Sequence, residues 1–190
     1  MNRAVFLDRD GTINIDKAYV YKKEDFIYLD GVKEGLKALS DAGFLLIVIT
    51  NQSGIGRGYY TLEEYKELEA WLFEDLRADG IELTASYFCP HHKDAKITEY
   101  KKECSCRKPL TGMYEQAAAD YDIDIKNSFV IGDRLRDLTP CNLGAAGFLL
   151  YADASEYADC DTDVKLDKNK VHFVNGGLKE AADVILSGMK

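Results

Sequence analysis

The sequence contains few of the features that mark disordered, fibrous or membrane proteins. Its 190 residues include only 3 prolines and 1 tryptophan, with no low-complexity tract and no internal repeat. No apolar run comes near the roughly 20 residues that cross a bilayer, and the first residues lack the apolar core of a signal peptide. We therefore expect a cytoplasmic monomer without membrane contacts, folded as a single domain over residues 1–190.

Positive charge is also scarce. The chain has 24 lysines and arginines against 33 aspartates and glutamates, which gives a net charge of −9. Proteins that bind nucleic acids nonspecifically use a general cationic surface to displace counterions from phosphates, and this chain offers none. We expect no nucleic-acid partner, so any phosphate-binding site must be local. The 46% of hydrophobic residues is enough to bury a substantial core.

Strand-like and helix-like segments alternate along the chain. Short apolar runs bounded by turn residues predict buried strands, and apolar residues at helical spacing predict helices. We place strands at 4–7, 44–49, 85–88, 128–131, 148–151 and 171–174, and helices at 32–42, 61–79, 113–121, 136–143 and 178–186. This alternation predicts a doubly wound α/β fold with a mainly parallel sheet covered on both faces. We expect residues 50–60 to form a loop and residues 14–28 to form a functional flap.

The most informative stretch follows the first predicted strand and reads Asp8-Arg9-Asp10-Gly11-Thr12. The carboxylates of Asp8 and Asp10 share one side of an extended backbone, because they are two residues apart. Two like charges at the edge of a core are costly unless a cation, a shared proton or a catalytic task offsets them. An acidic turn that merely closes a strand is the plainer interpretation.

Polar residues that follow the other strands argue against that plainer interpretation. Thr50 follows the second strand, Arg107 and Lys108 lie in the loop after the third, and Asp133 follows the fourth. The carboxyl ends of parallel strands meet at one edge of the sheet, so these side chains should converge. Carboxylates, a hydroxyl and fixed cations suit phosphoryl transfer, in which Mg²⁺ and cations bear the charge on the phosphoryl oxygens.

The motifs in this order resemble those of the haloacid dehalogenase (HAD) superfamily of phosphatases. They are Asp8-Arg9-Asp10-Gly11-Thr12, Ile49-Thr50-Asn51-Gln52, Cys106-Arg107-Lys108-Pro109, and Ile131-Gly132-Asp133-Arg134 with Asp137. The resemblance spans residues 3 to about 151 and implies a HAD-like fold with a minimal cap. Taken singly, Thr50 could cap a strand, Lys108 could be a solvated lysine, and the acids could decorate a helix start.

The resemblance implies a mechanism that the residue types also suit. Asp8 would attack phosphorus and form an aspartyl-phosphate, and Asp10 would act as general acid and then general base. For that task, Asp10 should have its pKa raised relative to Asp8. Mg²⁺ would be held by Asp8, Asp133 and the backbone carbonyl of Asp10, while Thr50 and Lys108 would stabilise the phosphoryl oxygens. Asp137 is expected to orient Lys108 or a metal-bound water.

The loop after the third strand carries a second signal. Cys89-Pro90-His91 is followed, after twelve residues, by Cys104-Ser105-Cys106. Three thiolates and an imidazole in two close pairs match a closed, structural Zn²⁺ site in a loop at about 89–106. Reduced structural cysteines and a disulfide are the competing interpretations, and a cytosolic setting disfavours the disulfide. Cys141 and Cys160 are left over, as a buried small residue and a surface thiol.

This zinc loop narrows the resemblance to the heptose-bisphosphate phosphatase family within the HAD superfamily. That resemblance implies His91 rather than His92 as the zinc ligand, and hydrolysis of the C7 phosphate of D-glycero-D-manno-heptose 1,7-bisphosphate. It also implies a set of substrate contacts at Asp16, Lys17, Ala18, Tyr19, Thr50, Asn51, Gln52, Ser53, Arg107, Lys108 and Arg134. A bisphosphate needs a second anion site, for which Arg107, Arg134 and Arg57 are candidates. Histidinol-phosphate phosphatase and a zinc-stabilised phosphosugar-binding module without turnover are the alternatives.

Overall fold

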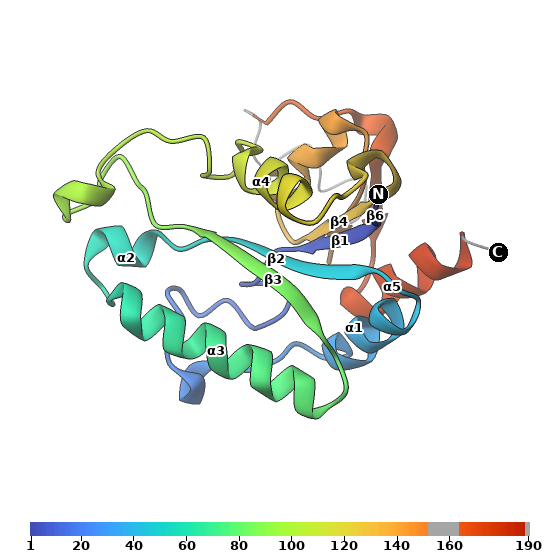
Figure 1. Ribbon diagram of the computed structural model, residues 1–190, viewed down its shortest axis with the longest axis horizontal. Coiled ribbons are helices and arrows are strands. Elements are labelled where there is room, and N and C mark those ends of the chain that lie inside the picture. The colour runs from blue at the N-terminus through green and yellow to red at the C-terminus, as the bar shows by residue number, and fades with distance from the viewer. Residues whose placement is uncertain (152–163, 189–190) are drawn as a thin grey trace.

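The computed structural model describes residues 1–151 and 164–188 and is built around a six-stranded sheet. Its strands are β1 (Ala4–Leu7), β2 (Leu45–Asn51), β3 (Leu83–Cys89), β4 (Phe129–Gly132), β5 (Ala146–Leu150) and β6 (Val171–Val174). They lie in the order β3-β2-β1-β4-β5-β6, and every neighbouring pair is parallel. The predicted parallel α/β sheet is confirmed, with β6 at one edge (Figure 1).

The central strand β1 explains why the sheet needs cover on both faces. All four of its residues are fully buried, as an apolar run in the middle of a parallel sheet should be. Val5 and Leu7 pack into one core cluster, whereas Ala4 and Phe6 pack into another on the opposite face. The two-residue period of the strand therefore builds two separate cores from four consecutive residues.

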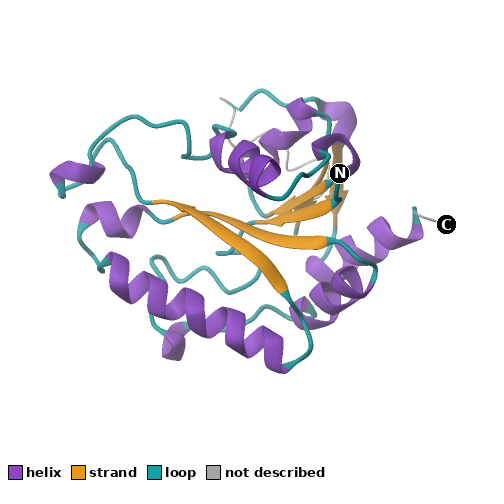
Figure 2. Cartoon of the chain, viewed as in Figure 1, coloured by secondary structure: helices purple, strands orange, loops and turns teal. Residues whose placement is uncertain are grey.

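Helices form the two outer layers (Figures 1 and 2). Helices α1 (Val32–Asp41), α3 (Leu62–Ala78) and α5 (Leu178–Ser187) cover one face. Helix α4 (Gly112–Asp120) and a 3-10 helix at Leu135–Leu143 cover the other. Helix α3 begins at a capping box in which Thr61 and Glu64 bond each other's backbone amides, as their spacing predicts. Short 3-10 turns lie at Lys23–Asp25, Thr98–Tyr100, Ile125–Asn127 and Lys168–Lys170.

Two segments differ from the sequence prediction. The expected loop at 50–60 contains helix α2 (Ser53–Arg57), and the expected helix at 136–143 is a 3-10 helix that begins at Leu135. Helix α2 was missed because glycines at 54, 56 and 58 weaken the helical signal. Two of them serve packing, because a Cβ on Gly54 would lie 2.1 Å from the ring of Tyr60 and one on Gly56 would lie 2.5 Å from the Pro90 carbonyl oxygen.

The strand order fixes where a ligand can bind. The chain winds outward from β1 in one direction and from β4 in the other, so a switch point lies between these two neighbouring strands. In open parallel sheets, ligands bind beyond the carboxyl ends of the strands at such a point. Asp8 follows β1 and Asp133 follows β4, which puts both carboxylates at the switch point. Within the described ranges, no helix is long and apolar enough to cross a membrane.

Candidate active site

The Lys108 ammonium is the centre of a buried cluster of charges. Its Nζ donates hydrogen bonds to Asp8 Oδ1 at 2.6 Å and to the Ile49 carbonyl oxygen at 2.7 Å, and it lies 2.8 Å from Asp137 Oδ1. Lys108 is 2% exposed and Asp137 is 1% exposed. The structure therefore brings together side chains that the sequence separates by 100 residues, and the contact expected between Asp137 and Lys108 is present.

Asp133 completes this cluster from the end of β4. Asp8, Asp133 and Asp137 place carboxylate oxygens within 4.8 Å of one another. Gly11 permits the approach, because its φ of +88° suits glycine and a Cβ there would lie 2.4 Å from Asp133 Oδ2. The other oxygen, Asp133 Oδ1, is buried and has no hydrogen-bond partner among the described residues. An orphaned buried oxygen in a group of three carboxylates is open to a cation.

The electrostatics of the cluster follow from its excess of negative charge. Burial, reinforced by the Asp137 carboxylate and opposed by Lys108, raises the pKa of Asp8 to about 8. Burial and Asp137 likewise raise the pKa of Asp133 to about 6. Burial disfavours the charge of Lys108, but Asp137 and Asp8 outweigh it and hold the pKa of Lys108 above its usual value. One ammonium thus does not neutralise three carboxylates.

The backbone of Lys108 is held by a side-chain clamp. Asn51 Nδ2 donates to the Lys108 carbonyl oxygen at 3.1 Å, and the Lys108 N–H donates to Asn51 Oδ1 at 3.0 Å. Asn51 lies at the end of β2, which places Lys108 opposite the carboxyl end of that strand. Asp137 is fixed in turn, because its Oδ2 accepts from the Arg134 N–H at 3.1 Å and its carbonyl oxygen accepts from the Tyr114 hydroxyl at 2.7 Å.

Asp10 faces hydrogen-bond donors rather than carboxylates. Its Oδ1 accepts from Arg9 Nη2 at 2.8 Å and from Asn14 Nδ2 at 3.0 Å, and its Oδ2 accepts from Gln52 Nε2 at 3.1 Å. These three donors hold the Asp10 carboxyl group in one orientation beside the cavity. Gln52 is itself fixed, since the Tyr60 hydroxyl donates to its Oε1 at 2.5 Å.

A cavity of about 320 Å³ opens onto these groups. Besides Asp8 and Asp10, it is lined by ten of the predicted substrate contacts, which are Asp16, Ala18, Tyr19, Thr50, Asn51, Gln52, Ser53, Arg57, Arg107 and Lys108. Lys17 and Arg134 are not among the lining residues. Arg134 is half exposed and faces Asp16 at 3.9 Å and Asp133 at 3.6 Å. Two residues that the sequence analysis did not select, Tyr60 and Arg136, line the cavity as well.

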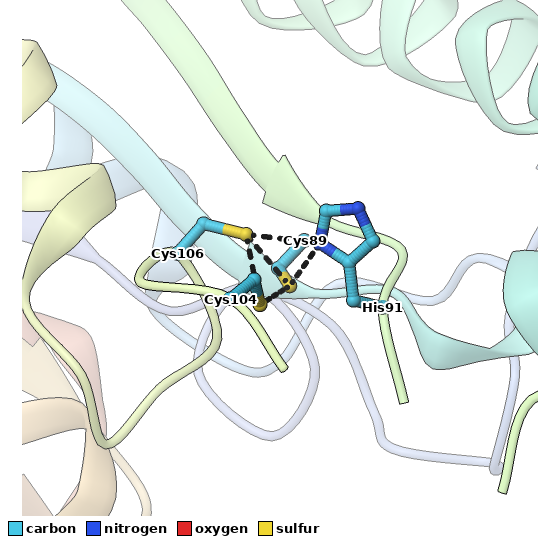
Figure 3. A group of neighbouring side chains, drawn as sticks. All are labelled: Cys89, His91, Cys104 and Cys106. Atoms are coloured by element: carbon cyan, nitrogen blue, oxygen red, sulfur yellow. Dashed lines mark hydrogen bonds between the residues drawn. The ribbon is translucent and has the colours of Figure 1, made fainter. Parts of the chain in front are cut away.

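The predicted zinc residues form a second cluster (Figure 3). The Sγ atom of Cys106 lies 3.0 Å from that of Cys89 and 3.3 Å from that of Cys104, and His91 Nδ1 lies 3.2 Å from Cys106 Sγ. The structure brings His91 into this group, whereas His92 contacts Arg57 Nη2 through its ring nitrogens. The four cysteines in the described ranges are free thiols, and Cys141 is buried as expected. Cys160 lies outside the described residues.

Comparison with known proteins agrees with this geometry. A family model described as polynucleotide kinase 3 phosphatase matches residues 3–174. A relative from Haemophilus ducreyi, named D-glycero-beta-D-manno-heptose-1,7-bisphosphate 7-phosphatase, is 40% identical over 188 residues, which cover 98% of this chain and 94% of the relative. The chain belongs to the HAD phosphatases. A second relative, from Photorhabdus laumondii, is named D-glycero-alpha-D-manno-heptose-1,7-bisphosphate 7-phosphatase. It is 45% identical over 136 residues, which cover 72% of this chain and 74% of the relative.

A solved structure resembles the phosphatase over its whole length. The crystal structure of D,D-heptose 1,7-bisphosphate phosphatase from B. bronchiseptica, complexed with magnesium and phosphate, matches with a TM-score of 0.81 and 29% identity. The match covers 98% of this chain and 99% of the other. The predicted HAD-like fold is therefore confirmed, and the resemblance to the heptose-bisphosphate phosphatases is confirmed by the relatives' names.

The residues that the sequence analysis missed in the phosphatase share one property. Neither is a named motif residue, since Tyr60 follows the second motif and Arg136 lies between Arg134 and Asp137 of the fourth. A signal for Arg136 was available, because it lies directly before Asp137 and close to the carboxyl end of β4. Tyr60 could have been found only through helix α2, which turns the chain back toward the site.

Proposed function

We propose that the phosphatase removes the phosphate at C7 of D-glycero-D-manno-heptose 1,7-bisphosphate in a Mg²⁺-dependent reaction. The observation that carries this proposal is the buried contact of Lys108 with Asp8 and Asp137, beside Asp133 and at the switch point of the sheet. The heptose-bisphosphate phosphatase names of the relatives support the substrate.

The reaction that these residues support has two chemical steps. Asp8 attacks phosphorus in line, so that a bond forms between its carboxylate oxygen and phosphorus while the bond to the sugar oxygen breaks. Asp10, which lines the same cavity, gives its proton to the departing sugar oxygen. In the second step, water attacks the phosphorus of the aspartyl-phosphate, and Asp10 takes a proton from that water. Asp8 is released as a carboxylate with inorganic phosphate.

Thr50 and Lys108 would stabilise the phosphoryl oxygens during both steps. Thr50 is 1% exposed, and its Oγ1 accepts a hydrogen bond from Gln52 Nε2 at 2.9 Å, so the hydroxyl proton remains free to donate. Lys108 keeps its positive charge, as its raised pKa indicates. Donors fixed before the substrate arrives stabilise developing charge without reorganising, which is the main source of catalysis in such sites.

The acidic cluster fits a magnesium ion. Asp8 and Asp133 would hold it, with the carbonyl oxygen of Asp10 as a further oxygen donor, since Mg²⁺ prefers oxygen ligands. The unpartnered Asp133 Oδ1 and the excess of carboxylates over ammonium are the features that fit a divalent cation. Asp137 is less suited, because Lys108 and the Arg134 N–H already occupy its two oxygens. When bound, Mg²⁺ supplies positive charge to the phosphoryl oxygens and keeps Asp8 ionised.

The thiol cluster fits a structural zinc ion. Ligand atoms about 2.3 Å from a shared Zn²⁺ lie roughly 3.8 Å apart at tetrahedral angles. The three sulfurs lie 3.0, 3.3 and 3.6 Å from one another, so each pair would spread by roughly 0.2 to 0.8 Å to bind zinc. Because Arg107 directly follows Cys106, zinc bound by Cys89, His91, Cys104 and Cys106 would fix the loop that delivers Arg107 and Lys108 to the cavity.

The alternatives gain less support. Histidinol carries an ammonium group that calls for carboxylates, whereas the lining of this cavity includes Arg57, Arg107 and Arg136. The relatives named above carry heptose names, and the histidinol-phosphate alternative is not supported. A binding module without turnover would not need the motif acids, and Asp8, Asp10, Asp133 and Lys108 are all present.

Phosphate release tests the proposal directly. The purified protein is given Mg²⁺ and equal concentrations of heptose 1,7-bisphosphate, histidinol phosphate or an oligonucleotide with a 3′-phosphate. We expect marked preference for the heptose, and loss of turnover by several orders of magnitude in Asp8→Asn with unchanged folding. A preference for either other substrate would overturn the substrate assignment. A nearly active Asp8→Asn variant would overturn the mechanism.

A further inference from the structure

Three arginines from separate segments of the chain line the cavity. Arg57 is the last residue of α2, Arg107 follows the zinc cluster, and Arg136 lies in the first turn of the 3-10 helix after β4. All three side chains are partly buried, and all three line the cavity that contains Asp8. Their charges act on one another, since Arg136 and Arg57 both disfavour the charge on Arg107.

None of these guanidinium groups forms an ion pair within residues 1–151 and 164–188. Arg107 Nη1 donates to the His91 carbonyl oxygen at 3.2 Å, and Arg57 Nη2 contacts His92. The Nε atoms of Arg57 and Arg136 are buried and have no described hydrogen-bond partner. Carboxylates are plentiful in a chain of net charge −9, yet none of the described ones forms an ion pair with these three arginines. The fold therefore keeps the three guanidinium groups apart from the described carboxylates.

Arg136 and Arg134 have different surroundings although they are two residues apart. Arg134 is half exposed and lies beside Asp16 and Asp133, which satisfy its charge. Arg136 has neither a described ion pair nor a described hydrogen bond, and it lines the cavity. Asp137, which anchors Lys108, directly follows Arg136 and ties its backbone to the reacting centre. A guanidinium held in this way can offer its paired N–H donors to a phosphate.

We propose that Arg136 is a specificity-determining residue that binds the second phosphate of the bisphosphate substrate, together with Arg57 and Arg107, while Asp8 attacks the first. This inference rests on the proposed function and deepens it. It adds Arg136 to the candidates of the sequence analysis, of which Arg134 is not among the residues that line the cavity. A phosphate dianion placed among the three guanidinium groups would relieve their mutual repulsion and supply acceptors for the unpartnered Nε donors.

The test compares two substrates that differ only in the second phosphate. Heptose 1,7-bisphosphate and heptose 7-phosphate are each hydrolysed by wild type, Arg136→Gln, Arg136→Lys and the surface control Arg77→Gln. We expect Arg136→Gln to lose roughly 10- to 100-fold in kcat/KM for the bisphosphate, mainly through KM. The same variant should keep kcat/KM for the monophosphate within about twofold. Arg136→Lys should recover part of the loss, because it restores the charge without the fork.

The outcomes separate this inference from the proposed function. An equal loss on both substrates, or a selective loss in Arg134→Gln but not in Arg136→Gln, would overturn the role of Arg136 and leave the phosphatase activity standing. If wild type hydrolyses neither substrate, the proposed function fails. Calorimetric binding of the bisphosphate to Asp8→Asn, with and without Arg136→Gln, then decides the inference, because it needs no turnover. Equal Kd values in that pair would overturn it.

Discussion

Replacing Lys108 with methionine should destabilise the phosphatase more than most single substitutions. The ammonium contacts Asp8 at 2.6 Å and Asp137 at 2.8 Å, and it is 2% exposed. Methionine fills much of the same space but leaves these buried carboxylates without their cation. Removing one partner of a buried ion pair costs about 3–5 kcal/mol, because an uncompensated charge remains in the core.

The size of this loss should depend on pH. Buried carboxyl groups that lose their cation can take up a proton, and the pKa of Asp8 is already about 8 with Lys108 in place. Removing the cation raises the pKa of Asp8 further, so above about pH 8 the folded variant holds a proton that folded wild type has lost, and acidification reduces the difference in stability between them. The penalty should therefore be largest above about pH 8, at the wild-type pKa, and smaller at pH 6.

Urea unfolding without divalent cations measures this effect. The chain has one tryptophan, Trp71 in α3, whose fluorescence reports the transition. Lys37→Met is a matched control, since Lys37 pairs with Asp41 on the exposed surface of α1. That control should change the unfolding free energy by about 0.5 kcal/mol or less. A loss below about 1 kcal/mol in Lys108→Met at pH 8, or a loss that does not shrink at pH 6, would refute the role of Lys108 as the buried counter-charge.

Three further predictions concern the metals and Asp10. The Kd of Mg²⁺ measured by calorimetry should fall by up to about tenfold per pH unit as pH rises from 6 to 8. The reason is that protons on Asp133 and Asp8 compete with the metal. A pH-independent Kd would contradict this prediction. Cys104→Ala should lose bound zinc and lower Tm, whereas zinc-free wild type with an unaltered Tm would refute the structural metal. Tyr60→Phe should reduce kcat roughly 2- to 10-fold, because it removes the hydrogen bond that orients the Gln52 amide toward Asp10. An unchanged kcat would show that this orientation does not matter for turnover.

The fold was predictable because its determining signals are local and repeated. The four residues of β1 are all apolar and are followed directly by Asp8, so both the buried strand and its polar end can be seen in sequence. Alternation with amphipathic helices then fixes a parallel sheet, and Asp8, Thr50 and Asp133 must meet at one edge. Helix α2 was not predicted because its glycines are required by contacts with Tyr60 and Pro90. Such tertiary contacts cannot be seen in the periodicity of the sequence.

The proposed second anion site depends on a residue that the motifs do not name. Arg134 stands next to Asp133 and was selected for its place in the motif, whereas the cavity is lined by Arg136. The 3-10 helix after β4 decides which side chain faces which way, and the sequence analysis expected a helix that began one residue later. The donors around Asp10 were equally hidden, because Asn14 lies in the flap and Gln52 at the start of α2. Only the folded chain brings these segments together.

The charges of the cavity together describe the ligand that it binds. Asp8, Asp133, Asp137 and Lys108 carry a net charge of −2 when all are ionised, and a proton on Asp8 relieves part of it in the free protein. One divalent cation neutralises that excess, so the first phosphate meets a neutral or cationic surface rather than three carboxylates. The three arginines that line the same cavity hold +3 and form no described ion pair. A monophosphate would leave the charge of the arginines uncompensated, whereas a sugar with a phosphate at each end would bind both the acidic cluster with its cation and the arginines. This is the physical reason to expect discrimination in favour of a bisphosphate.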